Sequence, residues 1–247
     1  MAKTVLISGG SRGIGKATAC LMAQQGWRVA FTYRGDHAAA EATAAEIKTA
    51  GGDVVSIQSD TSVEADVVRA FDEAQGAFGA LTAVVANAGV VAPSMTLADM
   101  SVARMKTIFD TNILGTFLFA REAARRLPET AAEDKAIVLV SSVAARLGSP
   151  FEYVDYAASK GAIDTLTVGL SKELAGAGIR VNGVRPGLIE TEIHASGGQP
   201  DRAERLGRTV PMARPGTAEE IAGAIAWLCS ADASYCTGSL LDVTGGR

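Results

Sequence analysis

The sequence predicts an α/β protein built on one doubly wound parallel sheet of about seven strands, with helices on both faces. Short, continuously apolar segments rich in β-branched residues alternate with longer alanine-rich segments of helical periodicity. Such strands are typical of a parallel sheet that is buried on both sides. The length of 247 residues, with 48% hydrophobic and 20% charged residues, favours one large domain over two small ones.

The elements follow one another in a regular order along the chain. Seven segments are predicted to be strands: Thr4–Ser8, Arg28–Tyr33, Val54–Gln58, Ala83–Ala86, Ala136–Ser141, Arg180–Val184 and Ser239–Val243. Helical patterns lie between them, near residues 14–25, 37–50, 62–76, 101–126, 155–175 and 217–229. Residues 1–247 are therefore expected to form a single domain. Its one long irregular segment, around residues 188–215, is expected to be a lid over the substrate.

Composition excludes several classes of function. The net charge is −4 and the basic residues are scattered, which disfavours nucleic-acid binding. We expect a cytoplasmic protein, because no membrane-spanning run or signal-peptide layout is visible and the three cysteines are widely spaced. His37 and His194 are the only histidines, so neither a zinc centre nor a Ser-His-Asp hydrolase is expected, and no metal site is predicted.

A glycine-rich segment joins the first strand to the first helix. Its glycines, Gly9, Gly13 and Gly15, follow the spacing G-x-x-x-G-x-G, and Ser11 and Ile14 lie between them. Glycines at such a turn let the backbone approach a pyrophosphate at a helix N-terminus, which carries a partial positive charge. A tight turn without a ligand is the alternative, but the strand–turn–helix context favours a bound dinucleotide.

The residues near the end of the second strand predict which dinucleotide binds. An acidic side chain at this place binds the ribose hydroxyl of NAD, whereas cations accommodate the extra phosphate of NADP. The strand runs into Arg34, and Arg12 lies in the glycine segment, so two guanidinium groups are available for a phosphate. Asp36 is the rival, which a shifted strand boundary would bring to the NAD position. We predict NADP(H), with NAD(H) as the alternative.

Tyr156 and Lys160 form a candidate acid–base pair. They are four residues apart on a predicted helix, so they share one face. A free tyrosine has a pKa of about 10, and an adjacent ammonium lowers that pKa towards neutrality. The pair is therefore able to move a proton on and off an oxygen atom.

Taken together, these motifs resemble the short-chain dehydrogenase/reductase family over essentially the whole chain. The glycine segment resembles the family's TGxxxGxG motif with Ser8 in place of threonine, and Asn87-Ala88-Gly89 resembles the later part of its NNAG motif, although Ala86 replaces the first asparagine. Further matches, in chain order, are Asp60, Asn112, Ser142, Tyr156, Lys160 and the segment Pro186-Gly187-Leu188-Ile189-Glu190-Thr191.

The resemblance implies a Rossmann fold and hydride transfer between a nicotinamide cofactor and a carbonyl compound or secondary alcohol. By resemblance, Ser142 binds the substrate oxygen and Tyr156 exchanges a proton with it. Lys160 lowers the pKa of Tyr156 and binds the nicotinamide ribose, and Asn112 links Lys160 to solvent through a water molecule. Asp60 contacts the adenine, and the segment from Pro186 to Thr191 contacts the nicotinamide carboxamide. Two competitors are weaker: Ser141 faces another direction by strand alternation, and Tyr153 has Ala157 where a lysine is required.

The substrate and the assembly are less visible in the sequence. We expect Met95, Leu147, Phe151, Tyr153 and the segment Ile193-His194 to wall the pocket, which suggests a neutral carbonyl compound. Arg146 keeps an anionic or carrier-bound substrate open. The resemblance allows a 3-oxoacyl-carrier-protein reductase or a sugar dehydrogenase such as one for glucose; a nucleotide-sensing protein without catalysis is the rival class. In the family, the last helix, with Trp227, and the last strand form subunit interfaces, so a homotetramer is expected.

Overall fold

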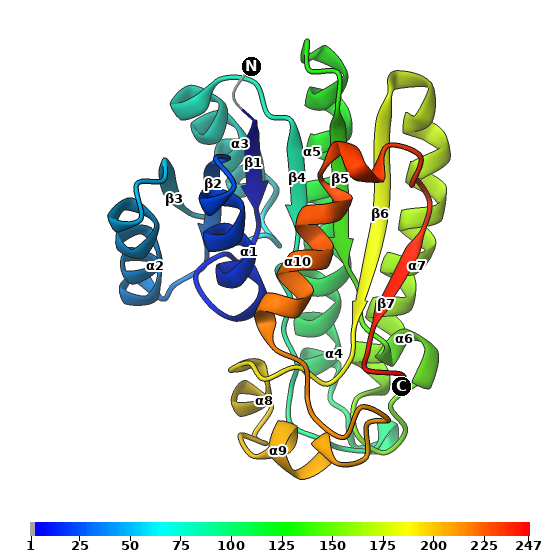
Figure 1. Ribbon diagram of the computed structural model, residues 1–247. Coiled ribbons are helices and arrows are strands. Elements are labelled where there is room, and N and C mark those ends of the chain that lie inside the picture. Colours follow the sequence, from blue (N-terminus) through cyan, green and yellow to red (C-terminus); the bar gives the residue numbers. More distant parts are fainter. Residues whose placement is uncertain (1–2) are drawn as a thin grey trace.

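The computed structural model describes residues 3–247, apart from the side chain of His194. Its core is one sheet of seven parallel strands in the order β3-β2-β1-β4-β5-β6-β7 (Figure 1). The predicted fold class is therefore confirmed. Because β1 pairs with both β2 and β4, the chain extends the sheet in opposite directions from its centre. This reversal creates a crevice at the carboxyl ends of β1 and β4, where such sheets bind ligands.

All seven strands lie where the sequence predicts them: three have the predicted bounds, and the ends of the other four are displaced by at most two residues. Their bounds are β1 Thr4–Ile7, β2 Arg28–Tyr33, β3 Val54–Gln58, β4 Ala83–Ala86, β5 Lys135–Val140, β6 Ile179–Pro186 and β7 Leu240–Val243. The central strands β1, β4 and β5 are buried along their whole length, which explains their continuous apolar sequence.

Helices cover both faces of the sheet (Figure 1). Their bounds are α1 Gly13–Gln24, α2 His37–Thr49, α3 Glu64–Phe78, α4 Val102–Phe109, α5 Thr116–Arg126, α6 Ala144–Leu147, α7 Val154–Leu174, α8 Ile193–Ser196, α9 Arg202–Gly207 and α10 Ala218–Leu228. Side-chain alternation along β1 divides the core: Val5 and Ile7 pack with α1, α2 and α10, whereas Leu6 packs with α3, α5 and α7.

The helix predicted over residues 101–126 is interrupted. A π-helical turn, Asp110–Gly115, separates α4 from α5, and Asn112 lies in it. π-Helical turns are rare and are frequent at functional sites. The segment 188–215 also differs from the expected irregular chain, because it contains the short helices α8 and α9.

The four central strands end at the same edge of the sheet. The glycine segment follows β1, Asn87 and Gly89 follow β4, Ser141 and Ser142 follow β5, and Gly187 follows β6. Across residues 3–247, no helix is long and apolar enough to cross a membrane.

Candidate active site

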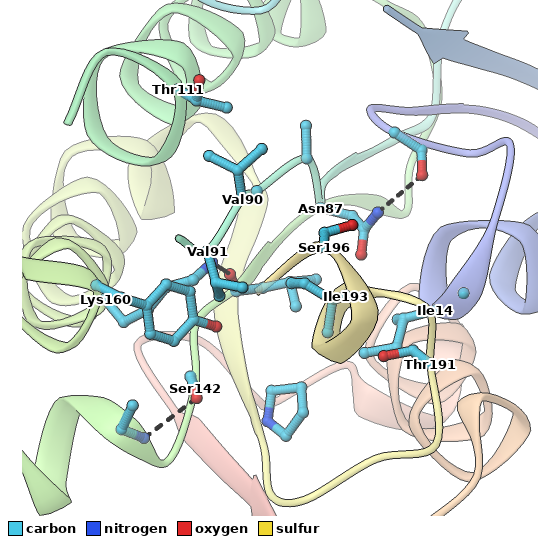
Figure 2. Close-up of a pocket in the computed structure, with 18 of the residues that line it drawn as sticks. Ile14, Asn87, Val90, Val91, Thr111, Ser142, Lys160, Thr191, Ile193 and Ser196 are labelled. Atoms are coloured by element: carbon cyan, nitrogen blue, oxygen red, sulfur yellow. Dashed lines mark hydrogen bonds between the residues drawn. The ribbon is translucent and has the colours of Figure 1, made fainter. Parts of the chain in front are cut away.

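A cavity of about 890 Å³ opens at the carboxyl edge of the sheet. Almost every residue that the sequence singles out lines it: Gly9, Ser11, Arg12, Gly13, Ile14, Gly15, Arg34, Asp60, Asn87, Gly89, Ser142, Tyr156, Lys160, Pro186, Gly187, Ile189 and Thr191. Asn112 does not line the cavity and is completely buried behind it. In Figure 2, Ser142 and Lys160 lie on one side of the cavity, and Ile14 and Thr191 lie on the other.

The glycine segment forms a turn that requires glycine at two positions. Gly9 has a φ of +67°, in the left-handed region that side chains disfavour. A Cβ atom on Gly15 would lie 2.1 Å from the carbonyl oxygen of Gly9, so any side chain there would push the turn apart. Arg12 precedes α1 and gives no side-chain cap, and no acidic residue lies in the first turn. The N-terminus of α1 therefore offers its first N–H groups and its dipole to an anion.

Ser8 and Asn87 hold the ends of β1 and β4 together. The hydroxyl of Ser8 accepts hydrogen bonds from the backbone N–H of Asn87 at 2.9 Å and of Ala88 at 3.0 Å. The Asn87 amide donates to the carbonyl oxygens of Ser8 and Gly9 at 3.0 and 3.1 Å. A hydroxyl at position 8 is thus enough to make the contact, and the change from threonine to serine is structurally conservative.

Both predicted phosphate-binding arginines are available at the cavity. Arg12 and Arg34 are exposed and line it, and neither guanidinium group has a hydrogen bond or ion pair in the described part of the chain. Asp36 does not line the cavity. Its carboxylate instead caps α2 by accepting from the N–H of Ala39 at 3.0 Å, because β2 ends at Tyr33.

Asp60 and Gly187 occupy turns after β3 and β6. One carboxylate oxygen of Asp60 accepts hydrogen bonds from the N–H and hydroxyl of Ser62 at 2.9 and 2.7 Å, which fixes the carboxylate beside the cavity. A Cβ atom on Gly187 would lie 2.7 Å from the Cα atom of Thr244. Thr191 lies opposite Gly13, about 3.4 Å from the place of a Cβ atom there.

Ser142, Tyr156 and Lys160 approach one another from β5 and α7. Ser142 is held by accepting a hydrogen bond from the N–H of Ala144 at 3.1 Å. The Nζ atom of Lys160 donates to the carbonyl oxygen of Val140 at 2.8 Å and lies 5.7 Å from the ring centre of Tyr156. The Lys160 ammonium is thus anchored to the end of β5, and the predicted proximity of the helical pair is present.

Burial changes the proton affinities of this group. Desolvation raises the pKa of Tyr156, and the hydrogen bond with Ser142 opposes this rise. Desolvation also lowers the pKa of Lys160 to about 8, while the Asp164 carboxylate opposes that change. The sequence predicts that Lys160 lowers the pKa of Tyr156. In the protein without cofactor the pKa of Tyr156 is raised instead, because desolvation is the largest effect on it. Tyr156 is therefore protonated at neutral pH, as a proton donor requires.

Asn112 lies in the π-helical turn and ties it to neighbouring elements. Its side chain accepts from the N–H of Val90 at 2.8 Å and donates to the Val90 carbonyl oxygen at 2.9 Å and to the Ser159 hydroxyl at 3.1 Å. A Cβ atom on Gly89 would lie 3.4 Å from Lys160 Nζ and 3.5 Å from Asn112 Oδ1. Gly89 therefore lies beside both the Lys160 ammonium and the Asn112 side chain.

The two competing residues have other partners. The one proton of the Ser141 hydroxyl is shared between Asp164 Oδ1 at 2.6 Å and the carbonyl oxygen of Lys160 at 3.1 Å, so Ser141 fastens the end of β5 to α7. The Tyr153 hydroxyl interacts with the Gln199 amide at 2.5 Å and lies over the cavity with the segment 188–215. Strand alternation and the missing lysine thus separate these residues from Ser142 and Tyr156.

The expected substrate wall is only partly present. Leu147, Tyr153 and Ile193 line the cavity, but Met95 and Phe151 do not. Phe151 has a φ of +64° and an exposed fraction of 81%, so its ring faces solvent. Arg146 pairs with Asp242 outside the cavity. The side chain of His194, expected as a polar part of the lid, lies outside the described residues.

Charged residues that the sequence interpretation missed complete the wall. Arg104, Glu152, Arg202 and Arg247 line the cavity, and Arg202 pairs with Glu152 at 2.7 Å. The helical spacing of Arg104, Ile108 and Asn112 puts Arg104 on the same helix face as a predicted site residue, and this signal was available in the sequence. Nothing in the sequence indicates that Arg202 and Glu152 meet. Among the residues that the structure describes, no cluster of His, Cys, Asp or Glu suited to a metal ion occurs.

Comparisons with known proteins show strong similarity over the whole chain. A family model described as enoyl-(acyl carrier protein) reductase matches residues 9–247. The uncharacterized oxidoreductase YgfF of Escherichia coli is 51% identical over 98% of both chains. Glucose 1-dehydrogenase 2 of Bacillus subtilis is 35% identical over 99% of this chain and 94% of its own.

Solved structures of related sequence have the same fold as this chain. A short-chain dehydrogenase/reductase from Serratia marcescens superimposes with a TM-score of 0.90 at 34% identity, over 99% of this chain and 97% of its own. A 3-ketoacyl-(acyl-carrier-protein) reductase from Brucella melitensis, complexed with NADH, gives a TM-score of 0.92 at 32% identity, over 99% and 98% of the two chains.

Proposed function

Because the chain belongs to the short-chain dehydrogenase/reductase family of oxidoreductases, we propose that it is an NADP(H)-dependent enzyme acting on a carbonyl compound or secondary alcohol. The observation that carries this proposal is the meeting of Ser142, Tyr156 and Lys160 in the cavity that the glycine segment also lines. An acid–base group and a dinucleotide cradle in one cavity are the two parts that hydride transfer to a carbonyl group requires.

The residues around the glycine segment fit a dinucleotide. Close approach is possible at Gly9 and Gly15, and the N-terminus of α1 has no competing carboxylate. We assign the pyrophosphate to Gly9, Ser11, Gly13, Ile14 and Gly15, the adenine to Asp60, and the nicotinamide side to Asn87, Gly89 and the segment from Pro186 to Thr191. When bound, the nicotinamide ring supplies or accepts the hydride.

Unpaired cations favour NADP(H) over NAD(H). Arg12 and Arg34 are exposed at the cavity and have no partner in the described part of the chain, so both guanidinium groups are available to a phosphate. Asp36, the only acidic candidate for the NAD position, is engaged as the cap of α2. This arrangement supports the cofactor assignment made from the sequence.

The chain's own residues handle the proton. In the reductive direction, Ser142 orients the substrate oxygen, and Tyr156, whose pKa burial raises, donates its proton to that oxygen. Lys160 has a pKa of about 8 and is mainly charged at neutral pH, so its ammonium stabilises the phenolate that Tyr156 becomes. We assign to Asn112 the link between Lys160 and solvent. In the oxidative direction, the same groups move the proton the opposite way.

Two activities within the family are candidates for the reaction of this protein. A 3-oxoacyl-carrier-protein reductase and a sugar dehydrogenase remain the alternatives within the family, and the relatives include proteins with the names of both activities. A nucleotide sensor would not need Ser142, Tyr156, Lys160 and Asn112 together, so catalysis is favoured. We further propose a homotetramer in the cytoplasm.

The proposal is tested with a panel of ketones, acyl thioesters and sugars, each assayed with NADPH and NADH by nicotinamide absorbance. Tyr156→Phe keeps the ring but removes the proton donor. We expect it to bind NADPH normally and to lose turnover by about 10²–10⁴-fold, the usual contribution of a general acid–base group. Unchanged turnover in this variant would exclude the mechanism, and inactivity of the native enzyme on the whole panel would favour the sensor.

A further inference from the structure

We propose that the buried ion pair of Arg104 and Asp155 is a positioning device for Tyr156, an inference that rests on the proposed role of that tyrosine. Asp155 precedes Tyr156 in the first turn of α7, and Arg104 comes from α4. The pair fastens the start of the helix that carries the proton donor to the loop that follows β4.

The Asp155 carboxylate accepts three hydrogen bonds from two residues. Its Oδ2 atom accepts from Arg104 Nε at 2.8 Å, and its Oδ1 atom accepts from Arg104 Nη2 at 3.3 Å. The same Oδ1 atom accepts from the backbone N–H of Tyr156 at 2.9 Å. That N–H is in the first turn of α7, where N–H groups have no partner within the helix. The orientation of the first turn of α7 therefore depends on a carboxylate that Arg104 holds.

Arg104 extends this connection to the cavity wall. Its Nη1 atom donates to the carbonyl oxygen of Pro93 in the loop after β4, and Arg104 itself lines the cavity. One guanidinium group thus contacts both the first turn of α7 and the loop that continues from Asn87 and Gly89. Because α4 also leads into the π-helical turn that holds Asn112, Arg104 lies on the element that precedes the assigned proton relay.

Burial distinguishes this pair from the other ion pairs of the described chain. The exposed fractions of the Arg104 and Asp155 side chains are 8% and 1%, whereas those of Arg126 and Glu122 are 20% and 4% and those of Arg185 and Asp164 are 16% and 14%. A buried ion pair gives little net stability compared with apolar residues of similar size, because both charges lose their hydration. Its bidentate geometry does fix the arrangement of α4 relative to α7. A fixed position of α7 in turn holds the Tyr156 hydroxyl in place.

Loss of the ion pair should slow catalysis, because the Tyr156 hydroxyl must be placed precisely. A displacement of about 1 Å in a reacting group costs roughly 10²-fold in rate. Removing Arg104 leaves the Asp155 carboxylate buried without its cation, so the first turn of α7 must shift to hydrate it. The hydroxyl of Tyr156 then moves relative to Ser142, while the glycine segment on the other side of the cavity is unchanged.

The experiment compares Arg104→Met, Arg104→Lys, Asp155→Asn and Arg125→Met in the full-length enzyme. Arg125 is the control, because its side chain is 59% exposed and it pairs with Glu122 on the same helix, α5. The measured quantities are kcat and KM for the best substrate of the panel, the Kd for NADPH from fluorescence, and the midpoint of urea unfolding.

We expect Arg104→Met to lower kcat by about 10²-fold and to leave the Kd for NADPH within about twofold. Arg104→Lys keeps the charge but not the bidentate contact, so its kcat should be intermediate; Asp155→Asn should resemble Arg104→Met, and Arg125→Met should resemble the native enzyme. The double variant Arg104→Met/Asp155→Asn should lose no more than the worse single variant, because the two residues act as a unit.

Several results would overturn the inference. A native value of kcat in Arg104→Met would overturn it. An equal loss of kcat and of NADPH affinity would also overturn it, because such a loss would indicate that the ion pair has only a structural role. If Arg104→Met does not fold, the decision rests on Arg104→Lys, whose native kcat would likewise overturn the proposal. Failure of the proposed function is seen separately, since Tyr156→Phe would then retain turnover.

Discussion

At the scale of single residues, two arginines carry the predicted choice of cofactor. Arg12 and Arg34 line the cavity without partners, whereas Asp36 caps α2. We expect Arg12→Ala and Arg34→Ala each to raise the KM for NADPH by about tenfold or more, as the loss of a charge-assisted hydrogen bond of roughly 1.5–3 kcal/mol implies. The KM for NADH should change little. Steady-state kinetics with both cofactors measure this, and Asp36→Ala is the matched control that should leave the preference unchanged.

Equal effects of the two arginine variants on NADPH and NADH would contradict this assignment. If Asp36→Ala changed the preference between NADPH and NADH, the result would instead support the rival interpretation, in which Asp36 binds the ribose of NAD. Both outcomes are read from the KM values of the native enzyme and the three variants, each measured with NADPH and with NADH.

Burial of Lys160 predicts a dependence of stability on pH. Its pKa is lowered from 10.5 to about 8 in the folded protein, so between these values the unfolded chain binds more protons than the folded one. The contribution of Lys160 to the free energy of unfolding must therefore rise with pH in this window. Below about pH 8 Lys160 is charged in both states, so the folded protein bears the full cost of burying that charge. From pH 8 to 9.5 the gain should be about 2 kcal/mol, since one pKa unit corresponds to about 1.4 kcal/mol.

Urea unfolding of the cofactor-free protein and of Lys160→Met at several pH values measures this effect. The difference in unfolding free energy between the two proteins should change in favour of the native protein as the pH rises. Groups that titrate equally in both proteins cancel in this difference. A difference that stays constant from pH 7 to 9.5 would show that Lys160 has an ordinary pKa.

At the scale of elements, the turn between β1 and α1 is defined by backbone contact. A Cβ atom on Gly15 would lie 2.1 Å from the Gly9 carbonyl oxygen and 2.6 Å from the Asn87 amide, so Gly15→Ala must open the turn. We expect this variant to lose NADPH binding, measured by fluorescence titration, and to be less stable in thermal unfolding. Gly76→Ala is the matched control, because Gly76 is inside α3 with open space around it. It should gain up to about 1 kcal/mol of stability and bind NADPH normally.

Binding of NADPH by Gly15→Ala with native affinity would mean that the turn does not cradle the dinucleotide. A loss of binding in both variants would mean that the assay reports stability rather than the local turn.

The elements also show what periodicity is able to predict. The strands and most helices are recognisable because each repeats one pattern over its whole length. The π-helical turn at Asp110–Gly115 is not, because its residues continue the pattern of the flanking helices and one wider turn changes no residue type. Asn112 was still recognised, through its resemblance to a family motif rather than through the helix geometry that presents it.

At the scale of the whole molecule, the gathering of the site was predictable because parallel strands end at one edge of the sheet. Gly9, Asn87, Ser142 and Gly187 follow four neighbouring strands, and the cavity lies between them. The ion pairs beside the cavity were not predictable, because partners such as Arg104 and Asp155 are 51 residues apart. Many other arginine–carboxylate pairs are compatible with the same sequence, and only the packing of α4 against α7 selects this one.

The surface of the molecule bears on its assembly. Among the described residues, β7 is the last strand of the sheet and has no further strand beside it, and an unpaired edge strand is a surface that proteins cover or pair. On α10, which packs against α1 on one face of the sheet, Trp227 remains 41% exposed, and Tyr235 between α10 and β7 is fully exposed. A second copy of the chain that packs on this region would remove both aromatic side chains from water.

The proposed homotetramer therefore gives a prediction for solution. Light scattering should report a mass about four times the 25.3 kDa of one chain. Trp227→Asp places a charge where the second copy would pack and should reduce that mass, because a buried unpaired charge is costly. Val102→Asp is the control: Val102 is 68% exposed at the start of α4, away from the α10 and β7 region. A native protein that is monomeric at working concentration would refute the assembly, and equal dissociation by both variants would place the interface elsewhere.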